Sequence, residues 1–93
     1  MKFKDAVAIV RKNYPNRLIW SGFDYKDKYI FSIAQDDKFV SGDTTLLSVS
    51  VDKKTEKTEI FPLAFRIWDD EDLAAAMEKT IYVDITKEQA FKQ

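Results

Sequence analysis

Acidic side chains are the best candidates for chemistry in this sequence, because the chain contains no His and no Cys. Those two absences remove the commonest general base, the thiolate nucleophile and the usual zinc ligands. Acidic residues gather at positions 69–72, and again at Asp36, Asp37 and Asp43. Carboxylate oxygens could hold a hard cation such as Ca²⁺ or Mg²⁺, or act as general acids and bases.

Each acidic group also has a simpler structural explanation. Residues 69–72 stand where a helix is expected to begin, and acids there cap the first turn and offset the helix dipole. The run lacks the alternating ligands and the glycine of a calcium loop. Asp36, Asp37 and Asp43 belong to a polar stretch that is expected to be a solvated loop. We therefore expect no catalytic residue, no metal site and no cofactor.

Glycine content and net charge disfavour two further classes of ligand. The only glycines, Gly22 and Gly42, are far apart in the chain, so they cannot build a glycine-rich phosphate loop. The 15 Lys and Arg residues are balanced by 16 Asp and Glu residues, which gives a net charge of −1. No basic excess is present to neutralise nucleic-acid phosphates or to attract an acidic membrane. We expect neither a nucleic acid nor a membrane as a partner.

The cellular location can be approached from cysteine and from apolar runs. Small secreted domains often carry disulfides, and this chain has no Cys. No segment reaches the 18 apolar residues of a transmembrane helix. The apolar run at residues 6–10 is stopped by Arg11 and Lys12, which argues against a signal peptide. We predict a cytoplasmic protein.

Aromatic side chains are the second lead, since they make up 14% of the chain. Trp20, Phe23, Tyr25 and Tyr29 are concentrated around one expected hairpin. Successive side chains of a strand point to opposite faces of the sheet, so some of these rings are expected on a second face that nothing covers. Exposed Tyr and Trp are good anchors for a protein partner. We predict an exposed binding patch that contains at least one of these four residues.

Three of the aromatic residues outside the hairpin bear on this prediction. Phe39 falls in the polar loop, and Trp68 directly precedes the second expected helix. Both are further candidates for partner binding. Phe65 and Trp68 could instead staple that helix, with Trp68 just before a cap at Asp69.

Hydrophobic spacing predicts two helices. Phe3, Val7 and Val10 recur at intervals of four and three, which indicates a helix over residues 3–13 that Pro15 prevents from continuing. The second helix follows the acidic residues 69–72 and buries a narrow stripe formed by Leu73, Ala76, Met77 and Thr80.

Alternating patterns predict strands between the helices, at residues 17–23, 28–35, 44–52 and 59–65. The second strand has apolar groups on both faces, so we expect it near the centre of the sheet. Gly22 indicates a bulge or a close approach of another group to the backbone. Pro62 cannot donate to a ladder, so the last strand is an edge strand or is broken there. Residues 81–85 are either a short strand or a continuation of the helix.

These elements predict a single α+β domain over residues 1–93, with 87–93 as a frayed tail. We expect an antiparallel meander of three to five strands, an N-terminal helix packed on one face and a second helix near the C-terminus. Leu47, Val49 and Val51 share one face of their strand, and serines occupy the other. We expect the helices to pack on the Leu47 face.

The order of elements resembles two groups of proteins. A helix ending in Tyr-Pro-Asn at 14–16, two strands, and a strand running into Val-Asp-Lys-Lys-Thr at 51–55 is similar to PepSY-like domains and to small bacterial toxin-immunity proteins of α-β-β-β-α order. Both groups tend to have a hydrophobic-Asp-x-x-Thr-Gly turn before the last strand, and Glu56 stands here at the glycine position. Both resemblances imply binding of a protein partner instead of catalysis.

The sequence therefore favours a non-enzymatic protein-binding or inhibitor module, immunity-like, from a bacterium or a mobile element. One alternative is a homo-oligomeric structural domain, in which the aromatic face is self-complementary. The least favoured alternative is an acid–base enzyme that uses oxygen groups alone, which would require two carboxylates converging in a pocket with a raised pKa.

Overall fold

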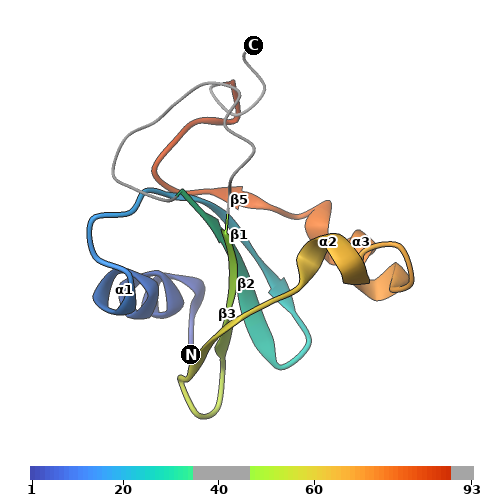
Figure 1. Cartoon of the computed structure of the whole chain (residues 1–93), viewed down its shortest axis with the longest axis horizontal. Coiled ribbons are helices and arrows are strands. Elements are labelled where there is room, and N and C mark those ends of the chain that lie inside the picture. The colour runs from blue at the N-terminus through green and yellow to red at the C-terminus, as the bar shows by residue number, and fades with distance from the viewer. Residues whose placement is uncertain (35–46, 89–93) are drawn as a thin grey trace.

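The computed structural model describes residues 1–34 and 47–88, and within these ranges five antiparallel strands form one sheet (Figure 1). The strand order is β4-β3-β2-β1-β5, so four strands form a meander and β5 returns to the side of β1. The strands are β1 (Ile19–Tyr25), β2 (Lys28–Ile33), β3 (Leu47–Asp52), β4 (Thr58–Ile60) and β5 (Ile81–Tyr82). The predicted α+β fold is confirmed.

Helix α1 (Phe3–Asn13) has the predicted bounds. Asp5 lies in its first turn and accepts a hydrogen bond from the Lys2 backbone N–H at 2.9 Å. Arg11 and Lys12 lie in the last turn, where cations interact favourably with the helix dipole. The side of α1 that faces the sheet buries Ala6 and Val10 completely.

Strands β1 and β2 form the predicted hairpin, with Lys26 and Asp27 in the turn. Lys26 has a positive φ of 52°, as expected for a residue in a tight turn between twisted strands. Strand β2 lies between β1 and β3 and has fully buried apolar side chains on both faces, including Ile30 and Phe31. Its predicted central position is confirmed.

The first face of the sheet is covered by α1. Val10 packs there with Phe31, Val49 and Val51 in one buried cluster. Gly22 lies close to this cluster, and a Cβ added to it would come within 2.5 Å of the Phe31 ring. The close approach expected at Gly22 is therefore confirmed, and the irregularity in the β1–β2 register lies elsewhere, between Ile19 and Ser21.

The second face of the sheet is covered by α2 (Leu63–Arg66) and α3 (Glu71–Met77), which lie opposite α1 (Figure 1). Leu73 of α3 is fully buried there against Phe23, Ile30 and Phe61. The expectation that the helices share the Leu47 face was wrong. The second face also carries a large apolar strip, and burying this strip against α3 removes it from water.

Three sequence-based boundaries were wrong. The strand expected at 17–23 runs over Ile19–Tyr25. The strand expected at 59–65 ends at Ile60, because Pro62 directs the chain into α2. The cap of α3 is Asp70 and not Asp69. The chain leaves the helix after α3 and forms β5, which pairs with Ser21 and Gly22, so the short-strand alternative for 81–85 is correct for Ile81–Tyr82.

Candidate functional site

All four aromatic residues predicted to form a binding patch are buried. The exposed fractions are 8% for Trp20, 4% for Phe23, 4% for Tyr25 and 7% for Tyr29. Phe23 and Tyr25 lie on the face of the sheet that α3 covers. Trp20 packs with Ala34 and Ile85. Tyr29 lies under the start of α1, where its hydroxyl donates to the Met1 carbonyl at 3.2 Å. The expectation of an exposed ring among these four was therefore wrong.

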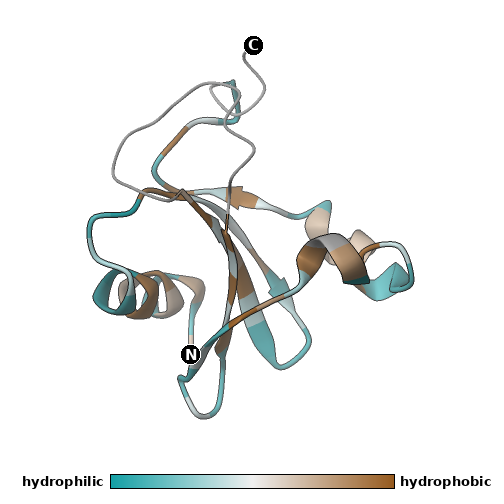
Figure 2. Cartoon of the chain, viewed as in Figure 1, coloured by the Kyte–Doolittle hydropathy of each residue, from teal (hydrophilic) through white to brown (hydrophobic). Residues whose placement is uncertain are grey.

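Among the residues that the structure describes, the most exposed large apolar side chains lie instead in and after α2. Phe65 is 83% exposed and Trp68 is 86% exposed. Neither packs as a staple for α3, so that alternative was also wrong. Figure 2 shows apolar α2 next to a hydrophilic turn that leads into α3.

The geometry of α2 explains this exposure. Leu63 and Ile67 pack against the buried cluster on the second face of the sheet. Ile67 keeps helical backbone angles. In a helix, Leu63 and Ile67 lie about 40° apart around the axis, and Phe65 lies about 160° from each of them, on the opposite side. Turning Phe65 inward would expose Leu63 and Ile67, so Phe65 is held outward. Trp68 follows in the turn after α2, where it is also exposed.

Sequence reasoning named Trp68 as a candidate for partner binding but not Phe65, because it read residues 59–65 as a strand. A strand places residues i and i+2 on one face, which would put Leu63 and Phe65 together. A helix separates them. The available signal was Pro62, since proline is favoured at the start of a helix as well as at a strand break. Leu63 and Ile67 also have the i, i+4 spacing of a helix face.

Asp70 anchors this segment to the sheet. Its carboxylate accepts hydrogen bonds from the Tyr25 hydroxyl of β1 and, at 3.0 Å, from the Leu73 backbone N–H. The Arg66 guanidinium lies 3.8 Å from the same carboxylate. The Tyr25 hydroxyl, and then the Leu73 N–H, hold the pKa of Asp70 below its usual value. The capping role expected for residues 69–72 thus falls to Asp70.

The segment 63–77, here called the α2–α3 arm, is acidic as well as aromatic. It contains one basic residue, Arg66, and four acidic ones at 69–72, so its net charge is −3. Asp69 and Glu71 are exposed, and neither forms an ion pair within the described ranges. Asp72 lies 3.5 Å from Lys26 of the hairpin turn in a solvent-exposed pair. The exposed aromatic pair is therefore followed directly by free negative charge.

Two carboxylates line a small pocket on the second face of the sheet. The pocket has a volume of about 80 Å³ and is lined by Lys28, Ser50, Asp52, Thr55, Lys57 and Glu59. The Asp52 carboxylate accepts from the Lys54 and Thr55 backbone N–H groups at 2.8 Å each. These donors lower the pKa of Asp52. Acid–base chemistry in this pocket would need a raised pKa, so Asp52 does not meet the requirement set above.

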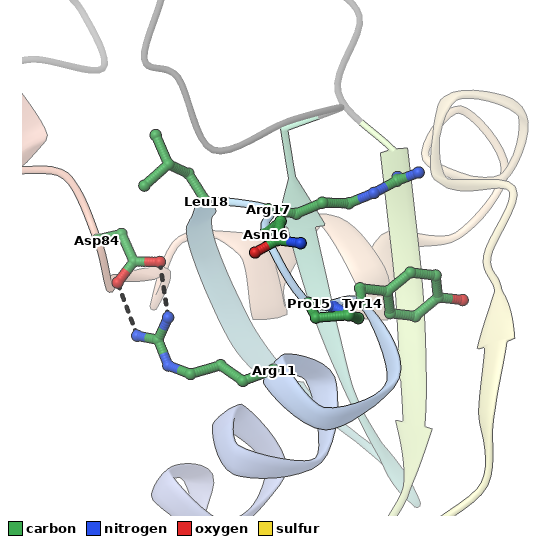
Figure 3. A pocket seen from close by; sticks show the side chains of 7 residues that line it. All are labelled: Arg11, Tyr14, Pro15, Asn16, Arg17, Leu18 and Asp84. Atoms are coloured by element: carbon green, nitrogen blue, oxygen red, sulfur yellow. Dashed lines mark hydrogen bonds and ion pairs between the residues drawn. The ribbon is translucent and has the colours of Figure 1, made fainter.

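A larger open pocket, of about 470 Å³, lies where α1 meets the start of β1 (Figure 3). Its best-defined feature is an ion pair, in which Arg11 donates to both oxygens of Asp84 at 2.7 and 3.1 Å. Asp84 also accepts from the Ile19 backbone N–H at 2.7 Å. Burial raises the pKa of Asp84, but the Arg11 and Ile19 donors outweigh it, so the pKa lies below its usual value. Asp84 therefore joins the segment after β5 to α1 and β1, and both of its carboxylate oxygens already accept hydrogen bonds.

Other candidates from the sequence cannot be placed. Phe39, Asp36, Asp37 and Asp43 lie outside the described residues. Within the described ranges, no group of three or more acidic residues is arranged to hold a metal ion.

Comparisons with protein-family models, with curated proteins and with solved structures found no match. The resemblance to PepSY-like domains and to immunity proteins therefore stays a prediction. Over the described part of the chain, no helix has the length and apolar character needed to cross a bilayer.

Proposed function

We propose that this protein is a non-enzymatic protein-binding module of the inhibitor or immunity-like class, from a bacterium or a mobile element. The α2–α3 arm is its contact surface. The observation that carries the proposal is the exposure of Phe65 and Trp68, at 83% and 86%, in and directly after a helix that packs on the sheet. The proposal includes action in the cytoplasm, supported by the lack of Cys.

Exposed aromatic rings of this size support binding for energetic reasons. Trp is highly buried on average in folded proteins, and an exposed ring leaves a large apolar area in water. Trp and other large aromatic residues supply much of the binding energy at protein interfaces. The anchoring of Asp70 to Tyr25 and of Ile67 to the core fixes the backbone that carries the two rings before any partner arrives. A preorganised surface loses less conformational entropy on binding.

The residue inventory supports binding over catalysis. The chain has no His and no Cys, which leaves only oxygen groups and lysines for acid–base or nucleophilic work. The pKa shifts at Asp52, Asp70 and Asp84 all favour the charged carboxylate, and each group already serves a turn, a helix cap or an ion pair. These shifts are typical of structural carboxylates.

A second candidate function, a homo-oligomeric structural domain, is favoured by the edges of the described sheet. Ile60 of β4 is 59% exposed and Ile81 of β5 is 51% exposed, and these strands are the two edge strands. Edge strands can pair with another copy of the chain. Sedimentation at low micromolar concentration distinguishes this candidate, because a monomer would argue against it.

Affinity capture tests the proposed function. Tagged wild-type protein, a Phe65→Ala/Trp68→Ala variant and an Ile60→Ala/Ile81→Ala variant are used as baits in a lysate of the source organism. We expect one dominant protein to be retained by the wild type and by the Ile60/Ile81 control, and lost from the Phe65/Trp68 variant. Equal retention of the same protein by all three baits would show that the arm is not the contact surface. Recovery of the bait alone would favour self-association.

A further inference from the structure

The arm also indicates the chemistry of its partner. Resting on the proposed function, we propose that the arm binds a basic protein segment, one that combines apolar side chains with clustered Lys or Arg. The segment would place its apolar side chains on Phe65 and Trp68 and its cations beside Asp69 and Glu71.

The first argument is the uneven distribution of charge. The whole chain has a net charge of −1 and the arm has −3, so the rest of the chain carries +2. The negative charge is thus concentrated in the segment that also carries the two exposed rings. A partner with the opposite charge pattern would be steered to this surface and oriented on it.

The second argument is the availability of that charge. Asp69 and Glu71 are exposed, and the one cation within the arm is already engaged. Arg66 lies over the Phe61 ring at 5.2 Å and 3.8 Å from Asp70. No basic group of the arm is therefore available to neutralise Asp69 and Glu71, and a partner cation could do so at the rim of the aromatic contact.

The same charges disfavour other occupants of the arm. A two-fold contact between copies would bring each acidic run against its own counterpart, because an isologous interface uses the same patch twice. Nucleic-acid phosphates and acidic membrane surfaces would be repelled in the same way. A basic protein segment is the occupant that meets both the apolar and the acidic part of the surface.

A peptide-display experiment tests this inference. A random library of 16-residue peptides is selected on immobilised full-length protein, after removal of peptides that bind a Phe65→Ser/Trp68→Ser variant. Selected peptides are then synthesised, and their affinities are measured at low and high salt. Two charge variants are compared: Asp69→Asn/Glu71→Gln in the arm, and Glu56→Gln/Glu88→Gln outside it, which makes the same change in net charge.

We expect the selected peptides to be enriched in Lys or Arg together with apolar residues. Trp68→Ala should weaken their binding about tenfold or more, as for a central aromatic contact. The Asp69/Glu71 variant should weaken binding several-fold at low salt and reduce its salt dependence, since a rim charge acts mainly through long-range attraction. The Glu56/Glu88 control should bind like the wild type.

The outcomes separate the inference from the proposed function. Neutral or acidic peptides that still require Trp68 would overturn the basic partner and leave the arm as a binding surface. Failure to enrich any peptide that binds the wild type over the serine variant would overturn both. A dimer in sedimentation that Trp68→Ala dissociates would assign the surface to a second copy, and would also overturn the basic partner.

Discussion

At the scale of single residues, two contacts connect parts of the chain that are distant in sequence. Gly22 leaves room for the Phe31 ring of the neighbouring strand, and Phe3 of α1 stacks on that ring with a centroid distance of 5.2 Å. Asp84 joins the segment after β5 to α1 through Arg11 and to β1 through the Ile19 N–H. Both contacts lead to stability predictions.

Gly22→Ala should destabilise the protein by about 1–3 kcal/mol, as expected for an added methyl group in a filled core. The new Cβ would lie 2.5 Å from Phe31 Cδ1, so the ring must move and disturb its contact with Phe3. The free energy of unfolding is measured by urea titration. In the double variant Gly22→Ala/Phe31→Leu the loss should be smaller than the sum of the two single losses. Additive losses would show that the ring is not the obstacle.

Asp84→Asn should destabilise the protein at neutral pH by about 1–3 kcal/mol, because it weakens the acceptor for Arg11 and Ile19. The folded-state pKa of Asp84 lies below its usual value of 3.8. Its contribution is therefore fully present above that value and is lost as the pH falls through the folded-state pKa.

The difference in stability between wild type and Asp84→Asn should accordingly narrow below about pH 4. Urea titrations from about pH 2.5 to about pH 7, which bracket the usual Asp pKa, check this. Asp69→Asn serves as the control, since Asp69 is exposed and makes no ion pair within the described ranges. A difference in stability between wild type and Asp84→Asn that stays constant with pH would show that Asp84 stabilises the fold without its charge.

At the scale of elements, the α2–α3 arm has a structural side and an outward side. Leu73 and Ile67 pack toward the sheet, and Phe65 and Trp68 point away from it. The hydrogen bond from Tyr25 to Asp70 fastens α3 to β1 at the same place. The arm is therefore attached to the sheet on one side and carries an exposed aromatic pair on the other.

Stability measurements should separate the two sides of the arm. Leu73→Ala should lower the free energy of unfolding by about 2–5 kcal/mol, because it leaves a cavity in the buried cluster on the second face of the sheet. Trp68→Ala should change stability by less than about 0.5 kcal/mol, as for an exposed position without a structural role. Thermal and urea unfolding of both variants test this. A large loss from Trp68→Ala would mean that the ring stabilises the fold, and would weaken its assignment to binding.

At the scale of the whole molecule, helices cover both faces of the sheet, and the exposed large apolar side chains of residues 1–34 and 47–88 lie mainly at the two sheet edges and in the arm. The described edge strands are short, with three residues in β4 and two in β5. Short edge strands offer few backbone groups to a second chain. The acidic arm disfavours a symmetric contact between copies.

The isolated protein should therefore be a monomer at low micromolar concentration. Sedimentation velocity at low salt and at about 0.5 M salt, which shortens the Debye length to roughly half its physiological value of about 8 Å, tests this without any partner. A dimer that appears only at high salt would indicate that charge repulsion masks an apolar self-contact. A dimer at both salt concentrations would favour the homo-oligomeric alternative.

The sequence by itself determined the local elements: α1 with its bounds, the β1–β2 hairpin, the central position of β2 and the general α+β class. Each of these depends on a periodicity or on a turn residue that acts within about ten residues of chain. An eleven-residue helix and a seven-residue strand are long enough for their periods to be distinguished. The predicted close approach at Gly22 depended on a glycine within a strand pattern, which is also a local signal.

Only the tertiary structure decided which aromatic side chains are exposed. Helix α2 has four residues, too few for a period of 3.6 to be distinguished from a period of two, so Phe65 was assigned to a strand. The burial of Tyr25 depends on α3, whose cap at Asp70 is forty-five residues away along the chain. The net charge of the arm can be read from the sequence, but its position beside two outward rings follows from which face of α2 packs on the sheet. The exposure of a side chain depends on packing between residues that are far apart in the sequence, so a local sequence pattern does not predict it.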